Sequence, residues 1–166
     1  MKPPRIPMEA LLHLEPACLR MSVPASYGDR NGHMNMRWYL AIFDDAGDDL
    51  HDRLGLTPEY HQHHMTSTID LEHHLNYVSE VFPNDHIAVY ARLVALSAKR
   101  LHYLMFMVNE TRGTLAAILE CMNAFADMTV RRTASFPPEI AEKIGGTLAA
   151  HTALCWQAPV CGAMQA

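Results

Sequence analysis

The sequence predicts an α+β fold in which an antiparallel sheet of five or six strands wraps around one long helix. Three observations predict it. A strongly amphipathic run follows the first strand candidate, four more strand candidates come after that run, and the last three candidates are joined by short links. Strands joined by short turns pair antiparallel, and a helix with one apolar face buries that face against a sheet.

The first strand and the long helix come from residues 19–54. Leu19, Met21 and Val23 alternate with polar residues, which predicts a half-buried strand that stops near Pro24. Apolar residues then recur at steps of three and four, which predicts a helix of about five turns that ends at Gly55. Its apolar stripe consists of Met36, Leu40, Phe43, Gly47, Leu50 and Leu54, and its other face carries Asp44, Asp45, Asp48, Asp49 and Asp52. The glycine on the stripe predicts a close approach of helix and sheet.

Four further strands are predicted in the second half of the chain. Residues 66–77 alternate cleanly, with His73 on the apolar side, where a hydrogen-bonded core histidine is expected. Residues 87–96, 100–108 and 115–130 follow, joined by "SAK" and by "NETRG", whose glycine marks a tight turn. "FPP" ends this pattern and precedes a weak helix.

Length and charge limit the classes of protein. The 166 residues predict a single domain over 1–166, with a core over 18–136 and a C-terminal helix over 137–156. A formal net charge of -5 argues against a nucleic-acid partner. No apolar run reaches the roughly 20 residues that span a bilayer, and the N-terminal stretch lacks the apolar core of a signal peptide. We therefore expect no membrane partner and a cytoplasmic location.

Histidines and cysteines suggest a metal site, but their spacing does not support one. The runs "HQHH" (His61, His63, His64) and "EHH" match neither HExxH nor a Cys/His zinc pattern, and the first follows a Gly- and Pro-containing stretch that predicts a loop. The four cysteines show no CxxC spacing and are expected to be reduced. We expect no metal ion.

The loop "YGDRNGHMNMRWY", residues 27–39, carries the candidate chemistry. It ends where the long helix begins, and a helix start offers unpaired N–H groups and a partial positive charge to an anion or a polarised carbonyl. Gly28 and Gly32 allow the backbone to bend and approach a ligand. Asp29 is placed to attack a carbonyl or to deprotonate water. Turn and cap chemistry is the alternative for Asp29, Asn31 and Asn35.

The same loop resembles a known family. "DRNGHMNMRWY" is similar to the acid–x–x–Gly–His–x–Asn–x–x–x–Tyr signature of hotdog-fold acyl-CoA thioesterases of the 4-hydroxybenzoyl-CoA thioesterase type. Over residues 18–156 the chain further resembles the carnitine-catabolism thioesterases, which are associated with betainyl-CoA hydrolysis. The segments that carry this likeness are "LEHHLNYVSEV", "KRLHYLMFMV", "LAAILECMNAFADM" and "FPPEIAEKI".

The resemblance implies a hotdog fold, an acyl-CoA substrate, and a homodimer or homotetramer with active sites at subunit interfaces. Asp29 matches the catalytic carboxylate, and the amide near Met36 matches the donor to the thioester oxygen. Gly32, His33 and Asn35 match the rest of the motif. No metal or redox cofactor is implied. In the other hotdog thioesterase class a glutamate lies inside the helix, whereas Asp44 and Asp45 lie too deep in it to serve.

A betainyl group requires aromatic faces or an acid around its quaternary ammonium. The resemblance places Glu72, His74 and Tyr77 in the second strand, and Trp38 and Tyr27 are also available. Core packing is the alternative for Trp38 and Tyr77, and exposure on a strand is the alternative for Glu72. Basic residues for the coenzyme A phosphates are Arg92, Lys99, Arg100, Arg131 and Arg132, unless they only form a wet strand face.

Three other functions compete with hydrolysis. A hotdog hydratase or dehydratase would use the acid–x–x–x–His spacing of Asp29 and His33 on the acyl chain, although the NGHMN context favours hydrolysis. A non-catalytic acyl-CoA-binding protein would bind without releasing CoA. A metal-binding protein is the last alternative.

Overall fold

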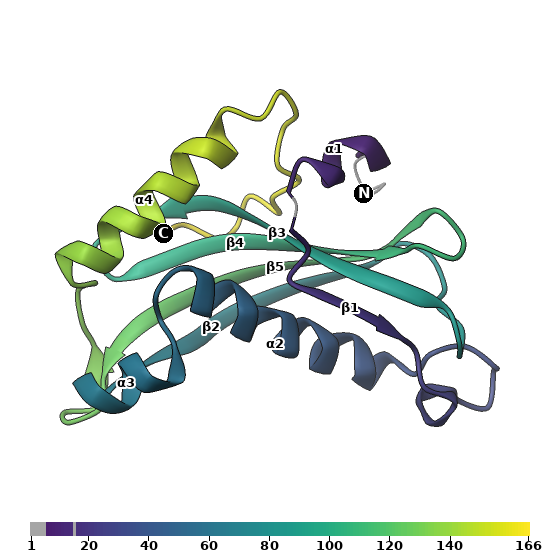
Figure 1. The fold of residues 1–166 in the computed structure, drawn as a ribbon, viewed down its shortest axis with the longest axis horizontal. Coiled ribbons are helices and arrows are strands. Elements are labelled where there is room, and N and C mark those ends of the chain that lie inside the picture. The colour runs from purple at the N-terminus through teal and green to yellow at the C-terminus, as the bar shows by residue number, and fades with distance from the viewer. Residues whose placement is uncertain (1–5, 15) are drawn as a thin grey trace. The chain divides into compact units, whose positions relative to one another are not determined.

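The computed structural model describes residues 6–14 and 16–166 (Figure 1). It contains one antiparallel sheet with the strand order β1-β3-β4-β5-β2, and β6 pairs with β5. The elements in chain order are α1 (Met8–Leu12), β1 (Leu19–Ser22), the 3-10 helix η1 (Ala25–Tyr27), α2 (Met36–Arg53), α3 (Pro58–His64), β2 (Thr66–Tyr77), β3 (His86–Leu96), β4 (Arg100–Asn109), β5 (Thr114–Asp127), β6 (Arg132–Thr133) and α4 (Pro138–Thr152). The predicted strands and long helix are confirmed, whereas α1, α3 and β6 are additional.

The chain divides into two compact units. The first contains the described residues up to Asp49 together with Leu75–Ala91 and Met105–Leu119, and the second contains Leu50–His74, Arg92–Leu104 and Glu120–Ala166. Strands β2 to β5 each contribute residues to both units. The single domain expected from the sequence stays a prediction.

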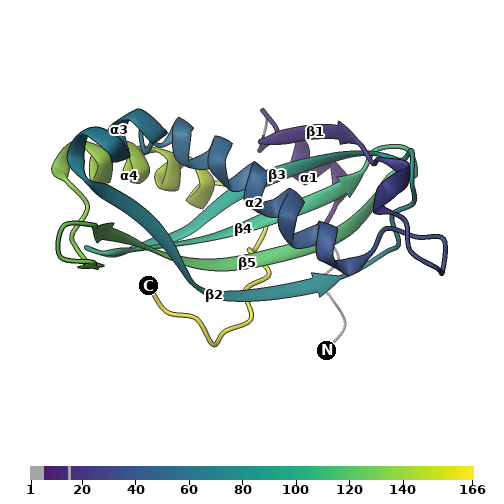
Figure 2. The ribbon, with the colours of Figure 1, turned by 90° about the horizontal axis from the view of Figure 1, so that it is seen from below.

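In the first unit, α2 runs across one face of the sheet (Figure 2). The buried side of this helix is formed by Tyr39, Ile42, Phe43 and Ala46. The predicted stripe is therefore wrong at its start, because Met36 is 68% exposed and Leu40 is 44% exposed. Tyr39 was not predicted in the apolar stripe because its side chain carries a polar hydroxyl, but it belongs to the core.

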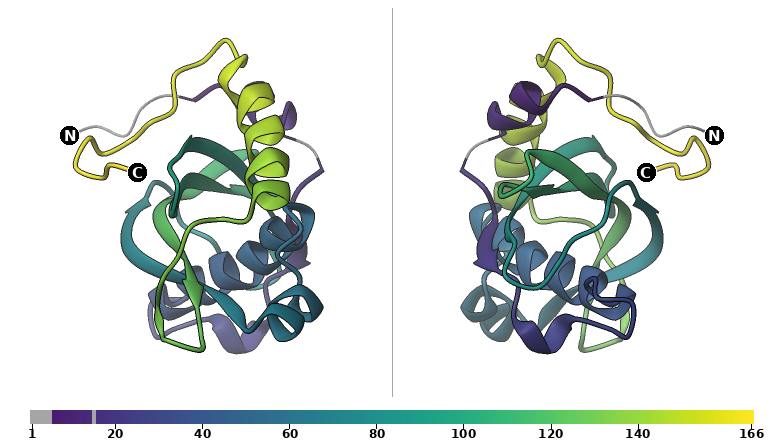
Figure 3. Two further views of the ribbon diagram at one scale, coloured as in Figure 1. Left: turned by 90° about the vertical axis from the view of Figure 1, so that its left-hand side faces the viewer. Right: turned by 90° about the vertical axis from the view of Figure 1, so that its right-hand side faces the viewer.

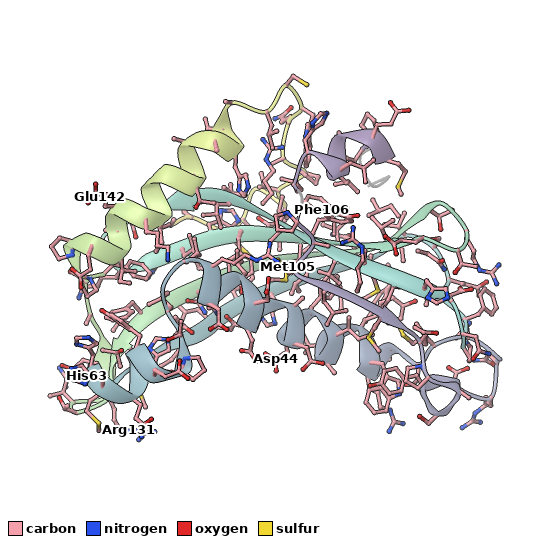
Figure 4. All side chains as sticks on the ribbon, in the orientation of Figure 1. Asp44, His63, Met105, Phe106, Arg131 and Glu142 are labelled. Carbon is pink, nitrogen blue, oxygen red and sulfur yellow. The ribbon has the colours of Figure 1, made fainter. Side chains whose placement is uncertain are left out.

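The glycine on α2 does not have the role that the sequence predicts. A Cβ atom built on Gly47 would lie 3.8 Å from Met105 Cε, which is ordinary van der Waals contact. An alanine would fit there, so the prediction of a close approach is wrong. The acidic face is confirmed at the exposed residues Asp44, Asp45, Asp48 and Asp52, and Asp44 points away from Met105 on β4 (Figure 4), whereas Asp49 is half-buried.

In the second unit, the "HQHH" segment forms helix α3 and not the predicted loop. Thr57 caps this helix, because its hydroxyl oxygen accepts a hydrogen bond from Tyr60 N at 3.2 Å, and Pro58 occupies the first turn. Met65 ends the helix in the left-handed region at φ 53°. His61 Nδ1 lies 3.0 Å from Thr66 Oγ1 and is engaged within the protein.

Helix α4, also in the second unit, lies beside β3 (Figure 3). His151 Nδ1 accepts a hydrogen bond from Leu93 N at 2.9 Å. Arg92 donates to the backbone oxygens of His151 and Trp156 and stacks on the Trp156 ring at 4.0 Å. Arg92 is 6% exposed, so the wet strand face, the alternative to a coenzyme A contact that the sequence suggests for it, is wrong.

Strand β2 ends the sheet, with β5 on one side. His73 is exposed and not the predicted core histidine, and its Nε2 lies 2.9 Å from Asp70 Oδ2. The other oxygen of Asp70 accepts from Cys121 and Asn123, at 3.3 and 2.7 Å. Burial is the largest influence on the pKa of Asp70 and raises it, but the hydrogen bonds together hold that pKa below its ordinary value.

Ligand atoms of Asp70, His73 and Cys121 lie within 4.8 Å of one another. Among the described residues, these three form the group whose side chains could hold a metal ion. Hydrogen bonds within the group account for its arrangement. None of the four cysteines takes part in a disulfide within the described residues. No described helix combines the length and the apolar character needed to cross a membrane.

Candidate active site

The loop before α2 is a tight turn. Asp29 and His33 form its two sides, with a hydrogen bond of 2.9 Å from Asp29 N to His33 O. Gly32 N donates to Asp29 O at 3.0 Å, and Gly32 has φ 84°, a backbone conformation that glycine adopts without strain. Asp29 Oδ1 accepts from Asn31 N at 2.8 Å. The turn therefore needs glycine at 32 and fixes one carboxylate oxygen of Asp29.

Asn35 caps the start of α2. Its Oδ1 accepts from Arg37 N and from Arg37 Nε, both at 3.2 Å. Its own N–H donates to Tyr27 O at 2.8 Å. The predicted cap role of Asn35 is confirmed, and the cap places the first residue of the helix, Met36, beside the turn.

His33 lies between two carboxylates. Its Nε2 is 3.3 Å from Asp29 Oδ2, and its Nδ1 is 3.1 Å from Glu80 Oε1. The side chains of His33, Asp29 and Glu80 are 32%, 18% and 66% exposed. The three groups can therefore exchange protons with one another and with solvent.

A cavity of about 530 Å³ opens at this cluster. The turn and the start of α2 form one wall, and the end of β2 with the residues after it forms the other. The lining residues are Asp29, His33, Met34, Asn35, Met36, Tyr39, Tyr77, Val78, Ser79 and Glu80. Met34 N donates to Val81 O at 2.7 Å, and this bond fixes one wall to the other.

Two tyrosines form the aromatic part of this cavity. The rings of Tyr39 and Tyr77 meet edge to face, with centroids 5.1 Å apart. Burial raises the pKa of Tyr39 above its ordinary value, a backbone hydrogen bond with Val81 acts against this, and Tyr77 and Glu80 raise it further. Tyr39 therefore stays a neutral phenol at physiological pH, and half-exposed Tyr77 presents ring surface to a ligand.

A second cavity of about 300 Å³ shares Asp29 and Asn35 with the first. Its other lining residues are Ser26, Gly28, Arg30, Arg37 and Trp38. The Trp38 ring stacks on Tyr27 with centroids 3.8 Å apart and planes 3° apart. The two cavities thus differ in character, because the first is lined by tyrosines and the second by arginines and Trp38.

The structure brings together most of the residues that the sequence suggests for the site. Asp29, His33, Asn35, Met36 and Tyr77 line the first cavity, and Trp38 lines the second. Tyr27 supports Trp38, and Gly32 shapes the turn.

Glu72 and His74 are not brought to these cavities. Both are exposed on the part of β2 that belongs to the second unit, and neither lines either cavity. Their substrate-binding roles stay predictions.

Sequence reasoning did not select Tyr39 and Glu80 as site residues. Tyr39 is the final tyrosine of the signature quoted above, so the motif contained its signal. Glu80 follows the predicted strand by three residues, and no spacing relates it to His33, because a contact across 47 positions depends on the fold.

The comparison with protein families matches residues 23–144 to the family described as "Thioesterase-like superfamily". A "Betainyl-CoA thioesterase" of Pseudomonas aeruginosa is 30% identical over 126 residues, which cover 76% of this chain and 79% of that protein. An "L-carnitine dehydrogenase/betainyl-CoA thioesterase" of Agrobacterium fabrum is 32% identical over 119 residues. That match covers 71% of this chain and 24% of that longer protein.

Among solved structures, a hypothetical protein from Staphylococcus aureus in complex with CoA is similar in fold. The TM-score is 0.80 at 24% sequence identity, over 89% of this chain and 93% of that chain. Together with the family match, this likeness confirms the predicted hotdog fold.

Proposed function

Because this chain belongs to the thioesterase-like superfamily, and is therefore a thioester hydrolase, we propose that its substrate is betainyl-CoA and that Asp29 is its catalytic carboxylate. The observation that carries the proposal is the junction of two different cavities at Asp29 and Asn35, beside the start of α2. An acyl-CoA has two different halves joined at the thioester, and the junction of the cavities supports a position of this bond beside Asp29.

The acyl group would occupy the first cavity. Ring faces attract a quaternary ammonium, and such contacts contribute about 0.5–2 kcal/mol each. Half-exposed Tyr77 presents its ring there, and the Tyr39 ring packs against it edge to face. This combination supports a cationic acyl group such as betainyl.

The coenzyme A half would leave through the second cavity. Arg30 and Arg37 line it and carry the positive charge that phosphate groups require, and Trp38 offers a flat surface. Arg30 and Arg37 are thus further candidates for CoA contacts, beside the basic residues that the sequence suggests.

Hydrolysis would proceed at the start of α2. The first amides of a helix lack intrahelical partners and can donate to the thioester oxygen as it gains negative charge. Met36, the first residue of α2, lines the cavity at this point. Asp29 Oδ2 either attacks the carbonyl carbon, which gives an acyl anhydride that water then cleaves, or takes a proton from a water that attacks directly. Both routes release the CoA thiolate.

The exposed apolar residues around the site support a homodimer or homotetramer. Met36, Tyr77 and Val78 line the first cavity and are 68%, 50% and 37% exposed. A second copy that covers them would close the acyl cavity and exclude water from it.

The first test measures free-thiol release from a panel of acyl-CoAs by the wild type and by Asp29→Asn. We expect release from betainyl-CoA, and a loss of about 10²- to 10⁴-fold in kcat in the variant, with an unchanged circular dichroism spectrum. The matched control is Asp44→Asn on the exposed face of α2, which should retain full activity.

The neutral isostere 3,3-dimethylbutanoyl-CoA tests the cationic substrate, because carbon replaces nitrogen in the same shape. Equal kcat/KM for both thioesters would contradict the betainyl assignment. Binding of CoA esters without thiol release would contradict hydrolysis, and double-bond hydration would point to the hydratase. Mass-spectrometric detection of the acyl group covalently bound to Asp29 after rapid quenching of the reaction would support direct attack by Asp29.

A further inference from the structure

We propose that Glu80 is a positioning residue that holds His33 in one tautomer, with Nδ1–H toward Glu80 and Nε2 toward Asp29. The catalytic consequence of this inference rests on the proposed function, but the contact itself does not. Neither the loop motif nor the similar proteins assign a role to this glutamate.

The geometry gives each nitrogen of the imidazole its own carboxylate. Glu80 Oε1 lies 3.1 Å from Nδ1, and Asp29 Oδ2 lies 3.3 Å from Nε2. Asp29 precedes His33 by four positions in the same turn, whereas Glu80 comes from the connection after β2. The ring is therefore held from two independent segments of the first unit.

The segment that carries Glu80 is anchored on both sides of this residue. Before it, Ser79 Oγ donates to Leu115 O at 2.8 Å, and Val78 N donates to Ala116 O at 2.8 Å. After it, Val81 O accepts from Met34 N, the residue next to His33. The backbone of residue 80 is thus fixed relative to the turn, although its side chain reaches solvent.

A further anchor follows at Asp85. One carboxylate oxygen, Oδ2, accepts from Phe82 N, Asn109 Nδ2 and Arg112 Nε at 2.9, 2.7 and 2.9 Å. Burial raises the pKa of Asp85, but these hydrogen bonds and the charge of Arg112 together hold it below its ordinary value. Asp85 therefore stays ionised and keeps the connection in place.

Hydrogen-bond chemistry fixes the tautomer. The Nδ1–Glu80 contact has the distance and alignment of a hydrogen bond, whereas Nε2 and Asp29 Oδ2 lie only within ion-pair distance. An ionised carboxylate only accepts, so the hydrogen bond to Glu80 places the imidazole proton on Nδ1. In the neutral ring Nε2 then carries the lone pair and faces the oxygen of Asp29 that does not bond to Asn31. A water between Nε2 and the thioester carbonyl can pass its proton to this nitrogen.

In the water step the water oxygen bonds to the acyl carbon and loses one proton to His33 Nε2, on the direct route by way of Asp29 Oδ2, which lies 3.3 Å from this nitrogen. The electron pair of the broken bond leaves with the CoA thiolate or, on the anhydride route, with the Asp29 carboxylate. The second proton ionises from the acid product. His33 then releases its proton to the thiolate or to solvent. Glu80 touches none of the reacting atoms and acts through the ring.

The first experiment needs no turnover. Nitrogen-15 NMR of the histidine rings, with His33 assigned through His33→Gln, reports which ring nitrogen carries the proton. In the wild type we expect the Nδ1–H tautomer for His33, and in Glu80→Ala we expect a mixture. An unchanged tautomer in Glu80→Ala would overturn the proposal.

The kinetic experiment separates positioning from binding of the substrate cation. Glu80→Gln keeps an oxygen that accepts from Nδ1–H, whereas Glu80→Ala does not. We expect kcat to fall in the order wild type, Glu80→Gln, Glu80→Ala, with a loss of about ten- to a hundredfold in the last. The loss should be the same for betainyl-CoA and its neutral isostere, with KM within about twofold. The control is Glu142→Gln at an exposed position of α4, which should leave kcat unchanged.

A rise in KM for betainyl-CoA alone would overturn the inference, because Glu80 would then bind the cation. Failure of the proposed function looks different. If no acyl-CoA is hydrolysed while the tautomer still depends on Glu80, the positioning role stands and only the reaction is wrong.

Discussion

The two oxygens of Asp29 have different neighbours. Oδ1 accepts from Asn31 N and Oδ2 faces His33, at 2.8 and 3.3 Å. A carboxylate fixed through one oxygen presents the other at a set angle, which catalysis requires. The sequence alone could not separate turn chemistry from catalysis at Asp29. In the structure Oδ1 belongs to the turn, and Oδ2 is the oxygen left for the proposed catalysis.

At the residue scale, Tyr77→Leu should change substrate preference more than stability. Tyr77 is half exposed, so the loss of burial is small, but one ring face of the acyl cavity disappears. We expect KM for betainyl-CoA to rise about three- to thirtyfold, which corresponds to one cation–π contact. KM for 3,3-dimethylbutanoyl-CoA should hardly change. Equal losses on both substrates would argue against a cation contact at Tyr77.

His151 predicts a pH-dependent stability. Burial lowers the pKa of His151 and the charge of Arg92 lowers it further, so the unfolded chain binds a proton more readily than the folded one. Stability should therefore be complete above the unfolded pKa of about 6.5 and decrease as pH falls below it. Protonation also removes the acceptor for Leu93 N.

The measurement is urea unfolding at pH 7.5 and at pH 5.5. His151→Gln should lower stability at pH 7.5 and reduce the difference between the two pH values. His63→Gln, on an exposed histidine of α3 (Figure 4), should leave the difference unchanged. An equal pH effect in wild type and His151→Gln would exclude His151 as its source.

At the element scale, strict periodicity allowed an element and its bounds to be predicted, whereas contacts between distant parts of the chain could not be predicted. Strand β2 has the bounds that alternation predicts, Thr66–Tyr77. Helix α3 was not predicted because the glycine and proline before the histidines indicated a loop, although Thr57 and Pro58 give an ordinary helix start. Glu80 could not be identified from the sequence, because its contact with His33 depends on how the connection after β2 packs against the loop before α2.

The long helix α2 offers a direct test at this scale. Gly47→Ala should stabilise the protein by about 0.5–1 kcal/mol, because glycine in a helix interior is less favourable than alanine and a Cβ fits against Met105. Chemical denaturation of both proteins measures this difference. Destabilisation would show that the helix does need close approach at Gly47, as the sequence first suggested.

At the scale of the whole molecule, a substitution of the exposed residue Leu40 tests the proposed oligomer. This side chain is 44% exposed on α2 and lines neither cavity. Large apolar groups gathered on a surface mark contacts with another chain. Light scattering after size-exclusion chromatography should give a dimer or tetramer for the wild type and smaller species for Leu40→Glu, with lower activity. Val130→Glu, at a 63% exposed position, is the control. A monomeric wild type with full activity would contradict the oligomer.

Strand β2 has a consequence for how the protein behaves in the cell. Its twelve residues end the sheet, so along most of its length one row of backbone N–H and C=O groups faces outward. Such an open edge recruits strands from other chains, and side chains of Asp70, Glu72 and the adjacent histidines place charge there that opposes indiscriminate aggregation.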